Sequence, residues 1–258
     1  MLRDLRLWIE RGDRGSRAGL EVVPEMLGDS GQLRAGILGI LIDSAGGDRA
    51  VREALPNWVA TSDLVYDVLR PVSAGVVEAR ARLLRKTRST LVLEVEVDGA
   101  EGPVALATMT FALLESRGEV LRMGAGRPEP RTEFYLEHSR LKAPFLAAMG
   151  ARVLDEASGC VELPLTPWVG NSLGALQGGA VAALLDLAAE TAARAVTGEP
   201  CVSVDLAINY LSLGRAGPIR SSARVLRHDA AGARIRVELR DAEARLLTVA
   251  SVTARTFS

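Results

Sequence analysis

The chain has 258 residues, of which 48% are hydrophobic and 24% charged, and its formal net charge is −1. This balance is typical of a soluble globular protein with one large core or two modest ones, and it lacks the basic excess expected of a nucleic-acid-binding protein. The two cysteines, Cys160 and Cys201, show no disulfide spacing. They favour a reducing compartment, and we expect a cytoplasmic protein. No run reaches the roughly 18 apolar residues of a spanning helix, so no membrane partner is expected.

In the first half, residues 1–14 mix both signs of charge and predict a short amphipathic helix rather than a secretory signal. A strand is expected at 17–24, followed by a glycine-containing turn and an apolar helix at 36–47. Residues 90–98 alternate apolar and polar side chains, which indicates a strand with one buried face. Residues 104–114 follow after a turn as its antiparallel neighbour.

Residues 117–132 are rich in glycine, proline and charge, and we expect them to link an N-terminal unit, 1–116, to a C-terminal unit, 133–258. The second unit is predicted to open with a helix at 134–149 and a strand at 152–165. An apolar helix at 179–196 comes next. The remaining predicted strands are 202–211, 219–227, 233–241 and 246–254.

The chain contains one unit twice. The stretch 171–190 repeats, 143 positions later and without a gap, a stretch of the first half, so that Gly179 aligns with Gly36 and Asp186 with Asp43. Weaker matches continue through the strands that follow each helix. A long buried helix and an antiparallel sheet, occurring twice, predict an α+β protein. In it, each sheet wraps its own helix and the two sheets join edge to edge or side by side.

The residues N-S-L-G-A-L-Q-G-G from Asn171, then Asp186, then V-S-V-D-L-A-I-N-Y-L-S from Val202, are similar to a known pattern. They resemble the hotdog-fold acyl-CoA thioesterases of the phenylacetic-acid-degradation type, over nearly the whole chain, as two hotdog units in tandem. The resemblance implies a double hotdog that hydrolyses acyl-CoA or aryl-CoA thioesters without a metal or redox cofactor, CoA being part of the substrate. It also implies a homo-oligomer, a homodimer of double-hotdog chains. The chain departs from the pattern at the family histidine, which is Gln177 here and Arg34 in the other copy.

Thioester hydrolysis needs a donor for the developing oxyanion and a group that attacks or activates water. Backbone N–H groups at Gly178 and Gly179, at a helix N-terminus, can polarise the carbonyl, and a helix carboxylate can act as nucleophile or general base. The resemblance takes the glycine and asparagine from one unit and the acid and hydroxyl from the other. Two composite sites follow. Site one combines Asn171, Gln177, Gly178 and Gly179 with Asp43 and Thr61. Site two combines Gly28, Arg34, Ala35 and Gly36 with Asp186 and Ser203.

Site one is the predicted catalytic site, because site two lacks the asparagine and has a methyl group at Ala35 where the substrate must approach. Asp186, Asn171 and Ser203 also have purely structural interpretations, as a satisfied buried acid, a turn residue and a locally bonded strand hydroxyl. Arginines at strand ends are candidates for binding CoA phosphates: Arg70, Arg85, Arg215 and Arg227. The alternatives are a non-catalytic acyl-CoA-binding hotdog protein and, less favoured because a catalytic histidine is missing, a hotdog hydratase or dehydratase.

Overall fold

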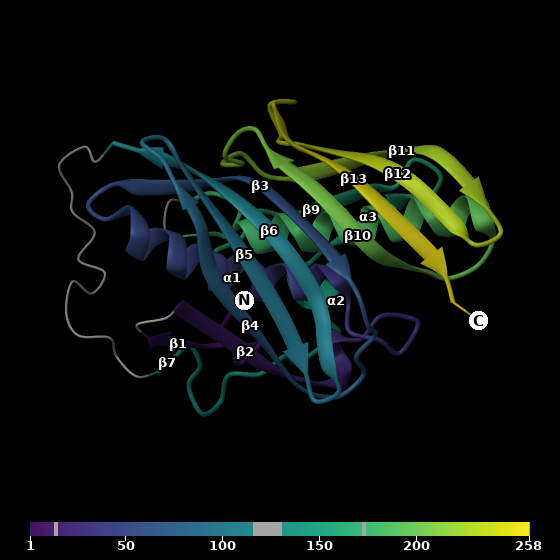
Figure 1. The fold of residues 1–258 in the computed structure, drawn as a ribbon. Coiled ribbons are helices and arrows are strands. Elements are labelled where there is room, and N and C mark those ends of the chain that lie inside the picture. Colours follow the sequence, from purple (N-terminus) through teal and green to yellow (C-terminus); the bar gives the residue numbers. More distant parts are fainter. Residues whose placement is uncertain (13–14, 116–130, 172–173, 258) are drawn as a thin grey trace.

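The computed structural model describes residues 1–12, 15–115, 131–171 and 174–257. Its strands form one antiparallel sheet in the order β7-β1-β2-β4-β5-β6-β3-β10-β13-β12-β11-β9-β8. The two halves of the sheet are equivalent about the β3–β10 junction. Moving outward from it, β6 corresponds to β13, β5 to β12, β4 to β11 and β2 to β9. Figure 1 shows the sheet passing from first-half strands to second-half strands, with helices α1 and α3 behind it. The predicted joining of the two sheets is therefore edge to edge.

The strands of the first half are β1 (Trp8–Gly12), β2 (Gly15–Val22), β3 (Trp58–Val68), β4 (Gly75–Lys86), β5 (Thr90–Gly99) and β6 (Gly102–Leu114). Those that follow are β7 (Thr132–Glu133), β8 (Arg152–Asp155), β9 (Cys160–Leu163), β10 (Cys201–Tyr210), β11 (Ile219–Asp229), β12 (Gly232–Arg240) and β13 (Leu246–Thr256). The alternation predicted for β5 is confirmed, because its apolar residues are all buried: Leu91, Leu93, Val95 and Val97. The helix-facing side of the sheet is thus apolar.

Helices α1 (Ala35–Ala54) and α3 (Gly178–Thr197) each have 20 residues, and they pack against one another. Glycine permits the close approach: a Cβ on Gly36 would lie 2.5 Å from Ala183 Cα, and one on Gly179 would lie 2.7 Å from Ile40 Cα. Helix α1 packs on β2 to β6, and α3 on β9 to β13. This arrangement, two sheet-wrapped helices crossing at their N-terminal glycines, is the double hotdog fold. No helix in the described parts of the chain is long and apolar enough to cross a membrane.

Three sequence predictions are corrected by the structure. The N-terminal segment is a turn followed by β1, because its apolar residues Leu7 and Ile9 are buried where β1 pairs with β2. The helix expected at 134–149 is reduced to α2 (Phe145–Met149), since Pro144 can stand at a helix start but interrupts a helix interior. The strand expected at 152–165 is split into β8 and β9 by a turn that ends at Gly159, whose φ is +54°.

The linker predicted at 117–132 lies outside the described residues except for Arg131 and Thr132. Thr132 begins β7, which pairs with β1 of the first half. Further on, Trp168 Nε1 donates a hydrogen bond to Asp4 Oδ2 at 2.8 Å. The chain therefore contacts the first half again after the predicted linker, at β7 and again at Trp168.

Candidate active site

Two acids meet two helix N-termini where α1 and α3 cross. The N–H of Gly179 donates to Asp43 Oδ2 at 3.0 Å, and the N–H of Gly36 donates to Asp186 Oδ2 at 3.0 Å. Each carboxylate comes from one half of the chain and each amide from the other. This reciprocal pair of contacts relates the two acids by a pseudo-twofold axis between the helices. The structure thus places each acid at the helix start of the other half, as both composite sites require.

Asp43, the acid of site one, is partly exposed to solvent. Burial raises the pKa of Asp43 to about 6, and the hydrogen bond from the Gly179 N–H opposes that rise. At pH 7 such a carboxyl is mostly ionised, yet it is more basic than an ordinary aspartate. Both properties suit a group that attacks a carbonyl or takes a proton from water.

Gly178, the first residue of α3, lies directly against this carboxylate. A Cβ at Gly178 would be 2.9 Å from Asp43 Oδ1, so only glycine leaves the acid in its place. The N–H of Gly178 donates to no acceptor among the described residues. It is partly exposed, and it is free to receive the oxygen of a bound carbonyl at the positive end of a helix dipole.

Tyr210 was missed by the sequence analysis. Its hydroxyl donates to the carbonyl oxygen of Gly178 at 3.0 Å, and Tyr66 donates to Ala35 in the same way at 2.9 Å. Burial, and then the charge of Asp43, raise the pKa of Tyr210 well above its ordinary value, so this donor stays protonated. The repeat gives no direct signal for this pair, since it aligns Tyr210 with Val68 and Tyr66 with Ile208.

The other predicted residues of site one lie in the loop before α3, at its N-cap and on β3. Asn171 Oδ1 accepts the N–H of Ala175 at 3.1 Å, which stabilises the loop before α3. Gln177 is the N-cap residue of α3, and its Oε1 is buried with no hydrogen-bond partner among the described residues. Thr61 precedes a register shift in β3, as Ser203 does in β10, and it makes no hydrogen bond to Asp43 within the described residues.

Site two is closed. Asp186 is 1% exposed, and Ala35 places a methyl group where Gly178 has none. Arg34 Nη1 lies 2.8 Å from Glu190 Oε2 in an ion pair that lies close to Asp186. Glu190 was not predicted as a site residue, although the repeat aligns it with Gly47, where an added Cβ would meet open space. The pair therefore exists at site two alone.

The buried ionisable groups of site two shift one another's pKa values. Burial, together with the charge of Asp186, raises the pKa of Glu190 to about 8, against the opposing effect of Arg34. Burial also raises the pKa of Asp186, whereas Arg34, Ser203 and the Gly36 amide lower it. The Ser203 hydroxyl is near enough to act on that pKa, but its geometry does not make it a hydrogen bond: neither Ser203 Oγ nor Asp186 Oδ1 has a partner in the described structure.

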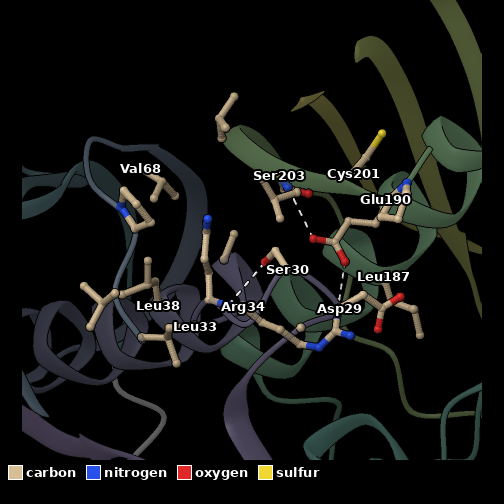
Figure 2. Close-up of a pocket in the computed structure, with 18 of the residues that line it drawn as sticks. Asp29, Ser30, Leu33, Arg34, Leu38, Val68, Leu187, Glu190, Cys201 and Ser203 are labelled. Atoms are coloured by element: carbon tan, nitrogen blue, oxygen red, sulfur yellow. Dashed lines mark hydrogen bonds and ion pairs between the residues drawn. The ribbon is translucent and has the colours of Figure 1, made fainter. Parts of the chain in front are cut away.

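A cavity of about 480 Å³ lies beside site two and not beside the predicted catalytic site. Figure 2 shows Arg34 between apolar side chains, Leu33 and Leu38, and the polar groups of Glu190 and Ser203. Of the four predicted CoA-binding arginines, Arg70 lines this cavity. The other three lie on separate elements: Arg215 on the loop after β10, Arg85 on β4 and Arg227 on β11.

The described residues contain no group of three or more His, Cys, Asp or Glu side chains placed to hold a metal ion. Site one presents a carboxylate, backbone amides and neutral polar side chains.

The model of the thioesterase superfamily matches both halves of the sequence, at residues 35–105 and 173–248. The chain therefore belongs to the thioesterase superfamily. Each matched segment includes one long helix and strands of its sheet. None of the curated proteins matches the sequence.

Solved structures resemble the whole chain. A Thermobifida fusca protein described as a candidate thioesterase II has a TM-score of 0.66 at 16% identity, covering 99% of this chain and 96% of that one. The TesB protein of Mycobacterium avium subspecies paratuberculosis has a TM-score of 0.64 at 12% identity, with 97% and 96% covered. An acyl-ACP thioesterase from Bacteroides thetaiotaomicron has a TM-score of 0.60 at 11% identity, with 92% and 96% covered. At these identities the likeness shows the fold alone.

Proposed function

We propose that this chain hydrolyses acyl-CoA or aryl-CoA thioesters at site one, with Asp43 as the attacking or basic group. The observation that carries the proposal is the difference in access between two otherwise equivalent acids. Asp43 is partly exposed beside a free helix N-terminal amide, whereas Asp186 is 1% exposed beneath an ion pair. A substrate can reach only the first. Membership in the thioesterase superfamily supports thioester hydrolysis as the reaction class.

The proposed chemistry uses the two amides of α3 differently. The Gly179 N–H donates to Asp43 Oδ2, while the Gly178 N–H donates to the thioester carbonyl oxygen and stabilises its developing negative charge. Tyr210 holds the Gly178 carbonyl and so orients this first turn. Such a donor contributes roughly a hundredfold or more to an acyl-transfer rate.

Asp43 can act in either of two ways. As a nucleophile, it forms an anhydride by attacking the carbonyl carbon, the thiolate leaves and takes up a proton, and water then cleaves the anhydride. As a general base, it takes a proton from water while the resulting hydroxide adds to the carbonyl, and the proton passes to the departing thiolate. Asn171 and Thr61 are proposed to orient the water or the carboxylate. Gln177 is proposed to bind the substrate through its amide.

The CoA part of the substrate is proposed to bind over the loop after β10. Gly214 on this loop accepts the N–H of Leu176, so the loop lies against the segment that leads into α3. Arg215 is its exposed cation and can pair with a phosphate. Arg70, Arg85 and Arg227 remain weaker candidates, because Arg70 belongs to the site-two cavity and the other two lie on β4 and β11.

One observation favours a second candidate function, a non-catalytic acyl-CoA-binding protein. Gln177 stands where the resembled family has histidine, and its buried Oε1 is unpaired within the described residues. A hydratase or dehydratase is less well supported, since both histidines, His138 and His228, are exposed and far along the chain from Asp43.

Release of free thiol from a panel of acyl-CoA and aryl-CoA thioesters tests the proposal. The panel should include one acyl-ACP, because a structural neighbour is described as an acyl-ACP thioesterase. We expect multiple turnovers with at least one CoA thioester. Saturable binding without turnover across the panel would instead favour the binding protein.

We also propose that the chain acts in the cytoplasm as a homodimer. The outward side of the sheet supports self-association, because the exposed apolar residues Val65 and Leu106 lie on the neighbouring strands β3 and β6. Light scattering at micromolar concentration tests the assembly, and a mass of 27.4 kDa would show a monomer.

A further inference from the structure

The cavity beside site two has apolar walls and a polar floor. Its volume of about 480 Å³ falls within the usual range of small-molecule pockets. The walls include Leu38, Val68, Leu187, Val202 and Val204, of which all but Leu38 are partly exposed. Apolar surface left open around a concave space favours a ligand with a hydrocarbon part.

The floor of the cavity offers hydrogen-bond donors that the protein itself does not use. The side chain of Arg34 is 12% exposed, and its only hydrogen bond among the described residues runs from Nη1 to Glu190 Oε2. The remaining N–H groups of the guanidinium donate to no described residue. Ser203 is 3% exposed, it lines the cavity, and its hydroxyl has no partner within the described structure. A buried hydroxyl and a buried guanidinium with spare donors point to an acceptor supplied from outside.

Site two lacks the groups that site one would use to hydrolyse a thioester. The amide of Gly36 is already engaged by Asp186, and Asp186 itself is sealed from the cavity side. Ala35 adds a methyl group at the first turn of α1. An acyl carbon bound in the cavity would therefore meet no accessible acid. The site is built to bind a ligand but not to cleave a thioester.

We propose that the site-two cavity binds an amphipathic carboxylate, an aliphatic or aromatic acid, with its carboxylate on Arg34 and Ser203 and its hydrocarbon part against the apolar walls. A carboxylate matches the planar fork of a guanidinium in two parallel hydrogen bonds, as the side chain of Glu190 partly does now. The guanidinium N–H groups of Arg34 that do not donate to Glu190 remain available to the ligand. This proposal does not depend on hydrolysis at site one.

Isothermal titration of the full chain with octanoate tests the assignment, with octanamide as the uncharged match and inorganic phosphate as a non-amphipathic anion. We expect octanoate to bind and Arg34→Gln to weaken it at least tenfold, the loss typical of a charge-assisted hydrogen bond. Gln is the residue that the repeat places at the equivalent position, Gln177. The double variant Arg34→Gln/Glu190→Gln should lose the same affinity without leaving a buried charge unpaired, which covers the case in which the single variant folds poorly.

Two control variants locate the ligand. Asp43→Asn, which alters only site one, and Arg224→Gln, which removes an exposed arginine outside the cavity, should bind octanoate as the wild type does. Equal affinity in the wild type and both Arg34 variants would overturn the proposal, as would a change in affinity caused by Asp43→Asn. Equal binding of octanamide, or displacement of octanoate by phosphate at similar concentration, would refute the carboxylate class. Binding that persists in Asp43→Asn while hydrolysis stops separates this site from the proposed activity.

Discussion

Gly178→Ala is the smallest change that should disable site one, and the chain already contains its counterpart at Ala35. The added Cβ would lie 2.9 Å from Asp43 Oδ1, 3.1 Å from Oδ2 and 3.2 Å from Cγ. Unstrained non-bonded contacts of this kind are a few tenths of an ångström longer, so the carboxylate must move by roughly half an ångström. Misplacement of a catalytic group by about 1 Å costs about a hundredfold in rate. We therefore expect kcat to fall by roughly tenfold to a hundredfold.

The variant should remain folded, since site two tolerates alanine at the equivalent position next to an acid that is 1% exposed. We expect the free energy of unfolding to change by less than about 1.5 kcal/mol. Thiol release at saturating and subsaturating thioester separates kcat from KM, and displacement of the Asp43 carboxylate should appear as a loss of kcat. The matched control, Ala35→Gly, should hydrolyse as the wild type does. A Gly178→Ala protein within twofold of wild-type kcat would refute the role given to this helix N-terminus.

Three further predictions concern the protonation of Asp43, the hydrogen bonds of the two tyrosines and the contact between Arg34 and Glu190. Because burial raises the pKa of Asp43 to about 6 and the ionised form is the reactive one, kcat/KM should rise with pH below about 6 and level off above it; a profile that falls through this range would contradict the role of the acid. Tyr210→Phe should lower kcat by about tenfold and Tyr66→Phe should not, although each removes one buried hydrogen bond worth about 1 kcal/mol in thermal melts. Arg34→Met should destabilise the protein by about 3 kcal/mol at pH 9, where the buried Glu190 carboxylate is charged and loses its partner. The destabilisation should be clearly smaller at pH 6, where Glu190 holds its proton. Urea melts at the two pH values check this.

Much of the fold follows from patterns that are local in the sequence. Alternation in residues 90–98 predicts the half-buried strand β5, and the repeat that aligns Asp186 with Asp43 predicts two equivalent buried helices. The resemblance to the hotdog-fold thioesterases, rather than the repeat, implies that each acid lies opposite the other half's helix start. Local pattern and spacing suffice here because each unit is built by short-range turns and antiparallel neighbours.

What the sequence does not reveal depends on contacts between distant residues. The strand β1 forms because it pairs with β2 and β7, and its charged composition alone indicates a helix instead. The ion pair that closes site two joins Arg34 to Glu190 across 156 positions. The cavity beside it depends on how loops from both halves pack, and no spacing rule contains that information.

The central claim is that two acids in equivalent positions have different roles because only one is accessible. The most direct measurement compares thiol release by Asp43→Asn and Asp186→Asn, two nearly isosteric changes that remove the same charge at the two sites. Asp43→Asn should lower kcat/KM by roughly a hundredfold or more, and Asp186→Asn should retain most of the activity. Loss of activity in Asp186→Asn with activity retained in Asp43→Asn would contradict the account and place the reaction at site two.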